Sequence, residues 1–503
     1  MRNGVLIGID AGTTVFKAAA FDARSGKVLA LSQHPLAVIS SKPGWRETPI
    51  AALNNALDVT MRELRVHVGA RWKNVTAIGI AAQGGSTIVV DRTSRKPFTN
   101  MILWSDARGN ECSRVERKRK TEAWWRARML NNWMPAGLGR LKWLITNHPE
   151  LCKSKNAMFI GAGEYLYHTF TGRWFQDRGS ALQIGTYSPS TGKLGTGPIV
   201  SLIPSLRENQ FAPLRKTNAT HPLSLAASAR FCLLNSNLIV AGPYMDQEAG
   251  LLSVSGVSTN PLQISLGTAW VGNFKISKHG LGFAGLQFVV RGADKDDRIV
   301  ILPLLTGNSA WDWALAQFAG SRKKNTLQAA DQIFRESLLP PDGMVCIPWL
   351  MQANPIDSAY QGAGTFFGVS ADTTAADFLR AVSCGMCFEL FRVFQTLKDA
   401  RKIDSVILSG GAAKGAHFQN LIATLFAPLP VYVQRNEDTA AARGALVAFN
   451  ATMTKSPVTR ISALRGKAAV AIITAYDTYL NTYAACTGKH PLGVPYTFTK
   501  EKR

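Results

Sequence analysis

Long apolar runs are missing from this sequence of 503 residues. Apolar residues make up 46% of the chain, but they occur in short runs broken by glycine, proline or charged residues. None of these runs approaches the roughly 18 to 20 apolar residues that a membrane-spanning helix needs. The chain also passes from Met1 directly into a strand-like segment, residues 5–9, without a charged-then-apolar signal segment. We therefore expect a cytoplasmic protein with no membrane partner and with two or more domains.

Closely spaced cysteines and metal-binding histidine patterns are also scarce. Seven cysteines, an odd number, are scattered along the chain, which excludes the dense disulfide framework of a small secreted domain. Cys384 and Cys387 form one close pair, but no second pair and no histidine lies nearby, so we interpret them as part of a buried helix face. The eight histidines show no metal-binding spacing.

Acidic residues are few: 33 against 57 lysines and arginines, which gives a formal net charge of +24. Such a surface attracts polyanions, but the charge is mostly diffuse. The densest basic run, residues 114–128, also contains Glu116, Glu122, Trp124 and Trp125 at helical spacing, which predicts one solvated face and one packed face. No nucleic-acid-binding motif accompanies the charge, so we expect no specific nucleic-acid partner.

Two common nucleotide-binding motifs do not account for this chain. The pattern G-x-x-x-x-G-K-[ST] is absent, which excludes a P-loop enzyme. Residues 280–285 fit the pattern G-x-G-x-x-G, but they do not lie between a clear strand and a helix of a βαβ unit. We therefore reject a dinucleotide site at these residues.

A strand, a short turn and a second strand, in contrast, occur together twice. Residues 5–9 lead into Asp10-Ala11-Gly12-Thr13-Thr14, residues 262–266 lead into Gly267-Thr268, and a second strand-like run follows each turn. A Gly-Thr corner lets backbone N–H groups and a hydroxyl approach phosphate oxygens closely. Either turn alone is best interpreted as an ordinary hairpin. Their recurrence, each at the start of one half of the chain, favours a duplicated nucleotide clamp with the ligand between the halves.

A further glycine-rich turn lies near the C-terminus. The apolar strand at residues 405–409 is followed by Gly410-Gly411-Ala412-Ala413-Lys414 and by a helical pattern from residue 418 to 426. Bare backbone at such a turn would accommodate a flat nucleoside, and a purely structural turn between strand and helix is an equally good interpretation.

Together these segments resemble the FGGY family of carbohydrate kinases, relatives of xylulokinase, glycerol kinase and gluconokinase, over nearly the whole chain. The matching segments, in chain order, are Asp10 to Thr14 with Lys17, residues 78–83, the Trp-x-Asp-x-Arg segment at 104–108, Asp246-Gln247, residues 265–268, residues 410–414, Glu437, and residues 442–445. The pattern is most similar to that of xylulokinase-like members.

The resemblance implies an α/β fold with two ribonuclease-H-like domains of the actin-like ATPase type and a ligand cleft between them. We expect an N-terminal domain at residues 1–242 and a C-terminal domain at residues 243–503. ATP, Mg²⁺ and a small sugar or polyol are the ligands that the resemblance implies.

Roles for individual residues follow from the same resemblance. Asp246 would be the catalytic general base, with a helix N-cap as its local alternative. Asp10 would orient Mg²⁺, with a turn-forming role as the alternative. The expected nucleotide-binding residues are Thr13, Thr14, Lys17, Gly267, Thr268, Gly307, Asn308, Gly410, Gly411 and Ala412. The expected sugar-binding residues are Gln83, Gly84, Trp104, Asp106 and Asp246. For Lys17 a solvated strand position, and for Trp104 a core position, are the alternatives.

Two departures from the family pattern concern the substrate. Gly84-Gly85 stand where xylulokinases carry Met-His and glycerol kinases Arg-Glu, and residues 348–354 lack the Gly-Glu-Arg of many members. Because hydroxyl-rich ligands are selected by paired hydrogen bonds, these changes leave the sugar open.

The function that we expect is ATP-dependent phosphorylation of a hydroxyl group of a small sugar or polyol, a ketopentose such as xylulose among the candidates. A non-catalytic ATP-binding switch with an actin-like fold and a sugar-sensing pseudokinase are the alternatives. The sequence leaves open whether the chain forms a homodimer.

Overall fold

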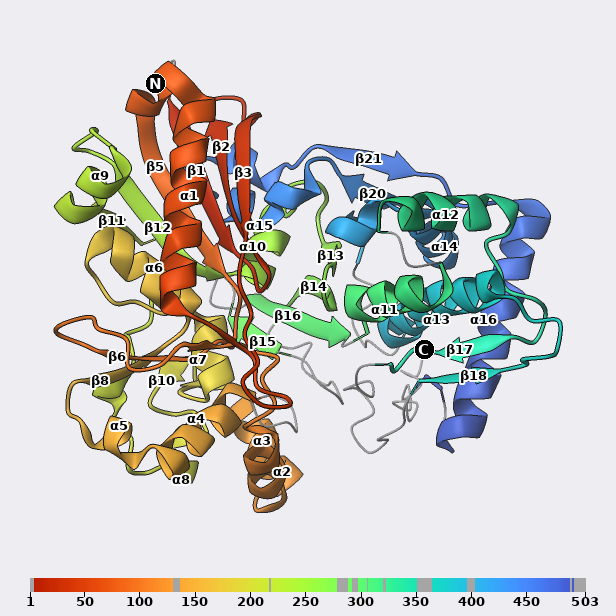
Figure 1. The fold of residues 1–503 in the computed structure, drawn as a ribbon, viewed down its shortest axis with the longest axis horizontal. Coiled ribbons are helices and arrows are strands. Elements are labelled where there is room, and N and C mark those ends of the chain that lie inside the picture. Colours follow the sequence, from red (N-terminus) through yellow and green to blue (C-terminus); the bar gives the residue numbers. More distant parts are fainter. Residues whose placement is uncertain are drawn as a thin grey trace, which may run out of the picture.

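The two halves of the chain each form a mixed β-sheet flanked by helices (Figure 1). The computed structural model describes residues 4–129, 136–216, 219–277, 288–291, 297–304, 306–319, 323–350, 364–395, 403–488 and 491–492. Residues 280–285, which fit the rejected dinucleotide pattern, and residues 351–354 lie outside this part. Among the residues described, no helix is both long enough and apolar enough to span a bilayer.

The first sheet has six strands in the order β11-β12-β5-β1-β2-β3. Their bounds are β1 (Val5–Ala11), β2 (Val15–Asp22), β3 (Val28–Pro35), β5 (Val75–Ala82), β11 (Thr220–Pro222) and β12 (Ile239–Met245). The strands β1, β2 and β3 form the antiparallel meander, and β5 pairs with β1 in parallel. The helices α1 (Ile50–Val68), α6 (Ala162–Thr171) and α9 (Leu225–Phe231) contribute to the core against this sheet.

The second sheet has seven strands in the order β15-β16-β14-β13-β19-β20-β21. Their bounds are β13 (Pro261–Leu266), β14 (Trp270–Ser277), β15 (Phe288–Arg291), β16 (Asp297–Leu304), β19 (Ser405–Ser409), β20 (Val431–Gln434) and β21 (Val458–Ile461). Its core includes side chains of α11 (Asn308–Phe318), α13 (Ala375–Gln395), α14 (Ala416–Leu425) and α16 (Gly466–Thr487). Cys384 and Cys387 are both buried in α13, as their spacing predicted.

The pairing of strands repeats between the halves. The hairpin β1–β2 corresponds to β13–β14, because each is antiparallel and its first strand pairs in parallel with a later strand, β5 or β19. In both sheets a further parallel strand and then an antiparallel edge strand follow: β12 and β11 in the first sheet, β20 and β21 in the second. The duplicated α/β fold expected from the sequence is therefore confirmed.

A helical subdomain extends the first half. It contains α2 (Asn110–Lys118), α3 (Glu122–Met129), α4 (Ala136–Asn147), α5 (Pro149–Lys153), α7 (Arg178–Ile184) and α8 (Ile199–Leu202), with the short strands β4 (Glu47–Thr48), β6 (Ile88–Asp91), β7 (Met101–Ile102), β8 (Ala157–Ile160), β9 (Tyr187–Ser188) and β10 (Lys193–Leu194). The basic run at residues 114–128 forms two helices, where the spacing predicted one. Its two faces are as predicted, since Trp125 is buried and Arg114 is exposed.

The junction of the halves is a close contact between backbones. The helix α15 (Ala440–Gly444) packs across β1 and β5, and α10 (Asp246–Leu252) packs against α15 (Figure 1). A Cβ atom added at Gly8 of β1 would lie 2.0 Å from the Ala442 carbonyl oxygen. Only glycine allows this approach. The same junction fixes α10, and therefore Asp246, against the first sheet.

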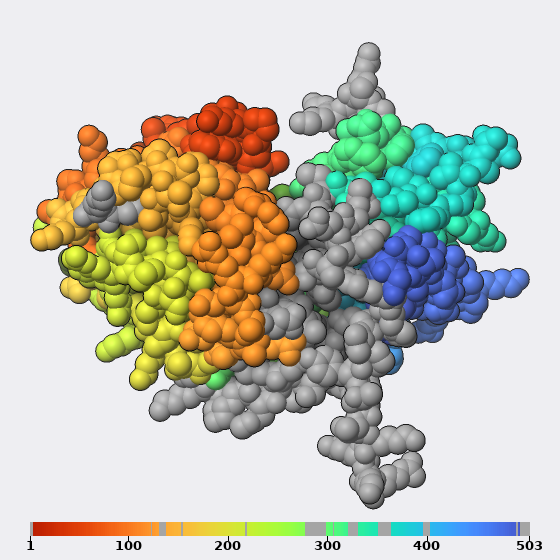
Figure 2. Space-filling view, turned by 90° about the horizontal axis from the view of Figure 1, so that it is seen from below, coloured from red at the N-terminus to blue at the C-terminus, as the bar shows by residue number. Residues whose placement is uncertain are grey.

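The two halves lie side by side in the space-filling view, with red to yellow-green residues on one side and green to blue residues on the other (Figure 2). The second half also contains α12 (Lys323–Glu336), β17 (Val345–Ile347) and β18 (Thr365–Phe367). The strand β12, which pairs within the first sheet, crosses the predicted boundary between residues 242 and 243. The division into residues 1–242 and 243–503 stays a prediction.

Candidate active site

The first Gly-Thr corner lies between β1 and β2. Asp10 is half-buried near the end of β1, opposite Lys17 of β2, and Thr14 at the turn is exposed. The Gly12 N–H donates to the Val15 carbonyl oxygen over 3.1 Å and closes the turn. Burial raises the pKa of Asp10; Lys17 lowers it in part, and Asp438 raises it further. The corner therefore presents a carboxylate and two threonines at one end of the sheet.

Lys17 connects this corner to the second half of the chain. Its Nζ atom lies 3.1 Å from Asp438 Oδ1, while Lys414 Nζ lies 3.3 Å from Asp438 Oδ2 and 2.8 Å from Glu437. The Lys17 side chain is 21% exposed, so it is not the freely solvated strand lysine considered as an alternative. Its role in phosphate binding stays a prediction. The ion pair brings the first corner next to residues 410–414.

The second Gly-Thr corner lies between β13 and β14, and the start of α11 is hydrogen-bonded to it. The Asn308 N–H donates to the Gly267 carbonyl oxygen over 3.0 Å, and the Trp270 Nε1–H donates to Asn308 Oδ1 over 3.1 Å. Thr268 is exposed. A Cβ atom at Gly307 would lie 2.5 Å from the Thr268 carbonyl oxygen, so glycine is needed there. These expected nucleotide-binding residues are therefore neighbours.

The glycine pair after β19 borders the same corner. Gly410 has a φ of +89°, and a Cβ atom on it would lie 2.8 Å from the Leu266 backbone. A Cβ atom at Gly411 would meet only Asn308 Nδ2, at 3.7 Å, and Gly411 is exposed. Ala412 begins the buried side of the turn. Bare backbone is therefore available beside the second corner.

Three residues expected to bind phosphate or sugar are linked by hydrogen bonds. The Trp104 Nε1–H donates to Thr13 Oγ1 over 2.9 Å, and the Thr13 hydroxyl donates to Gln83 Oε1 over 3.3 Å. Gln83 Nε2 donates to the Gly12 carbonyl oxygen over 3.2 Å. The sugar side and the first phosphate corner are therefore adjacent.

Both carboxylate oxygens of Asp106, another expected sugar ligand, already accept hydrogen bonds from the protein. Its side chain is completely buried, and its two oxygens accept hydrogen bonds from the Arg46 N–H at 2.6 Å and from the Arg108 backbone and guanidinium at 2.8–2.9 Å. These contacts hold the loop that carries Trp104. Direct sugar binding by Asp106 stays a prediction.

Asp246 is the first residue of α10, where the sequence suggested a helix N-cap; the cap is Met245 instead. Asp246 Oδ1 accepts a hydrogen bond from the Gln247 N–H over 2.8 Å, and the Gly84 N–H also donates to this carboxylate. Burial raises the pKa of Asp246 to about 7, and the nearby Asp10 and Asp177 contribute to the rise. The carboxylate can therefore exchange a proton near neutral pH.

Sequence reasoning missed several buried polar residues around Gly84-Gly85. Arg140 of α4 is 1% exposed and donates to the Trp104 carbonyl oxygen at 3.0 Å and to the Gly85 carbonyl oxygen. Gln183 of α7 lies against the glycine pair. Asp177 caps α7 by accepting from the Ser180 N–H at 2.9 Å. Asp177 with Ser180 three residues later is a helix-start pattern that sequence reasoning could have used.

Carboxylates are concentrated near this site. Burial raises the pKa of Glu164, and the nearby Asp177 adds to the rise. Glu248, which is half-buried and also has a raised pKa, lies 3.6 Å from Arg215. In the described ranges, no group of three or more His, Cys, Asp or Glu side chains could hold a metal ion. Mg²⁺ is commonly held by one or two carboxylates together with substrate phosphates. Asp10, a single carboxylate close enough to Asp246 to raise its pKa, fits that pattern.

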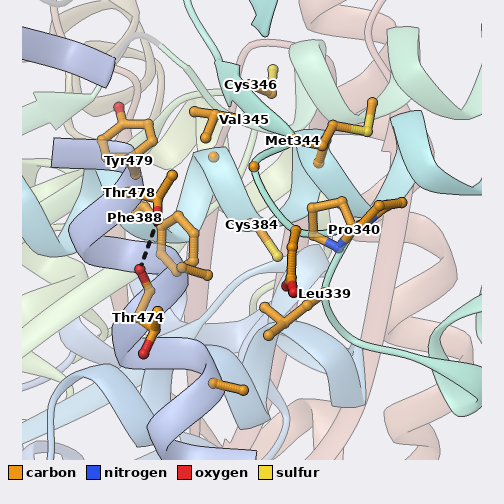
Figure 3. A pocket seen from close by; sticks show the side chains of 17 residues that line it. Leu339, Pro340, Met344, Val345, Cys346, Cys384, Phe388, Thr474, Thr478 and Tyr479 are labelled. Atoms are coloured by element: carbon orange, nitrogen blue, oxygen red, sulfur yellow. Dashed lines mark hydrogen bonds between the residues drawn. The ribbon is translucent and has the colours of Figure 1, made fainter. Parts of the chain in front are cut away.

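A pocket of about 250 Å³ lies elsewhere, between β17, α13 and α16 of the second half (Figure 3). It is lined by Cys346, Cys384, Phe388 and Tyr479 among others, and none of the expected site residues lines it. Burial keeps both thiols protonated by raising the pKa of Cys346 and Cys384. We therefore assign no part of the active site to this pocket.

The model of the FGGY family of carbohydrate kinases, N-terminal domain, matches residues 5–253, and that of the C-terminal domain matches residues 304–453. The L-xylulose/3-keto-L-gulonate kinase of Escherichia coli is 24% identical over 458 residues, which are 88% of this chain and 87% of that protein. The xylulose kinase of Bacillus subtilis is 23% identical over 454 residues, 88% of each chain. The structure of ligand-bound xylulose kinase from Lactobacillus acidophilus matches with a TM-score of 0.80 at 18% identity, over 97% of this chain and 99% of that chain.

Proposed function

Because this chain belongs to the FGGY family of carbohydrate kinases, we propose that it transfers the γ-phosphoryl group of ATP to a hydroxyl group of a small sugar or polyol. Its relatives named as xylulose and L-xylulose kinases make a ketopentose such as xylulose the first candidate. Membership in an enzyme family favours catalysis over the ATP switch and the sugar sensor.

The observation that carries this proposal is the half-buried carboxylate of Asp246 at the start of α10, whose pKa is raised. Transfer to an alcohol needs a group that removes the hydroxyl proton as the phosphoryl group arrives. A carboxylate with a pKa of about 7 suits that task at neutral pH. Asp246 is therefore proposed as the general base.

The two Gly-Thr corners are proposed to hold the triphosphate between the halves. Backbone N–H groups and hydroxyls at these corners would stabilise the charge that develops on the phosphoryl group. Lys17 would add positive charge once the phosphates compete with Asp438 for its amine. The residues proposed for the phosphates are Thr13, Thr14, Lys17, Gly267 and Thr268, and those for the adenosine are Gly307, Asn308, Gly410, Gly411 and Ala412.

Asp10 is proposed to hold Mg²⁺ together with the ATP phosphates. When bound, the ion neutralises charge on the β- and γ-phosphates. The protein's own contribution is a carboxylate that burial and a neighbouring Asp246 make receptive to a cation.

The sugar is proposed to lie beside Asp246 and to contact Gln83, Trp104 and the Gly84 backbone. Asp106 is proposed to keep the Trp104 loop in place or to bind the sugar directly. The hydrogen bonds among Trp104, Thr13 and Gln83 support this placement. A cytoplasmic location, a monomer or homodimer, and the absence of a specific nucleic-acid partner stay predictions.

The proposal is tested by measuring ADP release by the purified protein with Mg²⁺, ATP and one sugar at a time. The probes are D-xylulose, L-xylulose, D-ribulose, xylitol, glycerol and D-gluconate. We expect at least one of them to raise ADP release well above the rate without sugar. If none does while ATP binds normally, the assignment as a catalyst for small sugars is wrong.

Activity is expected to decline in acid because Asp246 must be ionised to accept a proton. Its pKa is raised above the ordinary value, so the inactive protonated form dominates below a pH of about 7. At low concentrations of ATP and sugar, kcat/KM should fall about tenfold per pH unit on the acid side. A flat profile between pH 5 and 8 would contradict this role.

A further inference from the structure

Gln183 of α7 occupies the space beside Gly84 and Gly85. The side chain is 9% exposed. A Cβ atom added at Gly85 would lie 1.9 Å from Gln183 Oε1, and one at Gly84 would lie 2.8 Å from Gln183 Nε2. Gly85 has a φ of +74°, which also disfavours a side chain there. The glycine pair therefore leaves room for the Gln183 carboxamide.

This carboxamide is poorly satisfied by the protein. Its hydrogen bonding within the described residues consists of one long contact, from Nε2 to the Met245 sulfur over 3.7 Å. Sulfur is a weak acceptor, so this contact satisfies the amide nitrogen poorly. Oε1 and the second amide hydrogen are left to bond something other than these residues.

Two residues that contact Gln183, Met245 and Gly84, also adjoin the proposed base Asp246. Met245 precedes Asp246 in the chain, and the N–H of Gly84 donates to the Asp246 carboxylate. A sugar hydroxyl within reach of Asp246 would therefore have its neighbouring carbons near Gln183.

The surroundings hold Gln183 in place. Asp177 caps α7 through the Ser180 N–H and hydroxyl, at 2.9 and 2.6 Å. Arg140 donates to the Gly85 and Trp104 carbonyl oxygens and so fixes the backbone beside Gln183. An amide held this way can discriminate between ligands, because a missing hydroxyl would leave it unpaired.

We propose that Gln183 is a specificity-determining residue that hydrogen-bonds, through its carboxamide oxygen and nitrogen, to oxygens on the carbons next to the hydroxyl that Asp246 deprotonates. This inference rests on the proposed function and names the substrate class of that site: a neutral ketose or polyol with adjacent oxygen groups. A carboxamide suits such a pair, since it donates one hydrogen bond and accepts another.

Charge around the carboxamide supports a neutral substrate rather than a sugar acid. Asp10 and Asp177 are each close enough to the Asp246 carboxylate to raise its pKa. The guanidinium of Arg140 uses its two terminal nitrogens on backbone carbonyls. A carboxylate on the substrate would therefore be repelled by these aspartates, and the Arg140 guanidinium would not be available to pair with it.

The test compares wild type with Gln183→Met, which keeps the volume but loses both hydrogen bonds, and with Gln183→Glu, which loses the donor. The probe is the neutral sugar of the ADP-release panel with the highest kcat/KM, together with deoxy analogues that each lack one hydroxyl. Gln183→Met should raise the sugar KM about 10- to 100-fold, with the KM for ATP within about twofold. With wild type, one deoxy analogue should have a KM raised by a similar factor over that of the parent sugar. With Gln183→Met, the KM of this analogue should be no higher than that of the parent sugar.

Each other outcome decides against the inference. An unchanged sugar KM in both folded variants, or equal penalties for every deoxy analogue in wild type and variant, would remove Gln183 from recognition. A kcat/KM for D-gluconate above that of the neutral sugars would refute the neutral class. If wild type releases no ADP with any sugar, the proposed function fails. The role of Gln183 is then tested by calorimetric titration of the same sugars into all three proteins. The inference is overturned if no sugar binds, or if the three proteins bind the sugars with equal affinity.

Discussion

Replacing Asp246 with Asn is expected to lower turnover by about 10²- to 10⁴-fold, the range typical of a lost general base. The amide keeps the size of the carboxyl group and an oxygen for the Gln247 N–H, which now donates to Oδ1 over 2.8 Å. It cannot accept a proton. Nucleotide binding should persist, because the proposed ATP contacts lie at the two Gly-Thr corners and at Gly410-Gly411. Turnover, ATP affinity by calorimetry and thermal unfolding are measured on the same preparation.

Glu248→Gln is the matched control for this variant. Glu248 lies two residues further along α10, is half-buried like Asp246 and has a raised pKa, but it lies 3.6 Å from Arg215. Its replacement should leave turnover within a few-fold. Near-normal turnover of a folded Asp246→Asn protein, or an equal loss in both variants, would show that Asp246 is not the base.

The repeated hairpins were predictable because their pattern is local. An apolar run, a Gly-Thr turn and a second apolar run lie within about 20 residues, and strand pairing between neighbours follows from such a pattern. Residues 5–9 and 262–266 accordingly form the inner strands β1 and β13. Residues 375–395 form α13 because large apolar side chains recur there at spacings of three and four. The helix at residues 114–128 was only partly predicted, since it breaks between Lys118 and Glu122.

The wall of the sugar site could not be predicted in the same way. Arg140 and Gln183 lie on two helices that meet Gly84-Gly85 only in the folded chain, about 55 and 100 residues away in sequence. An arginine and a glutamine in short helices are usually solvated, so their burial carries no local pattern. Likewise, nothing near Lys17 indicates its ion pair with Asp438, 421 residues later.

The junction between α10 and α15 leads to a second large effect, on stability and catalysis together. A Cβ atom added at Gly444 of α15 would lie 1.7 Å from the Ala249 carbonyl oxygen of α10. Backbone atoms cannot rotate away, so Gly444→Ala must push the two helices apart. Overpacking of this kind costs about 1–3 kcal/mol, and more where only backbone can yield. We expect the Tm to fall by on the order of 5 °C.

Turnover should fall with stability in Gly444→Ala, because Ala249 lies three residues after Asp246 on the same helix. A displacement of a reacting group by about 1 Å can reduce the rate about 100-fold. The matched control is Gly272→Ala in β14, where a Cβ atom would meet only Leu262 Cδ1 at an ordinary 3.5 Å. That variant should keep both Tm and turnover. Thermal unfolding and ADP release at 25 °C, well below either Tm, separate the two effects. A destabilised Gly444→Ala protein with normal turnover would show that α10 can shift without moving the Asp246 carboxylate out of reach. An unchanged Tm would show that the backbone contact between α10 and α15 contributes nothing measurable to stability.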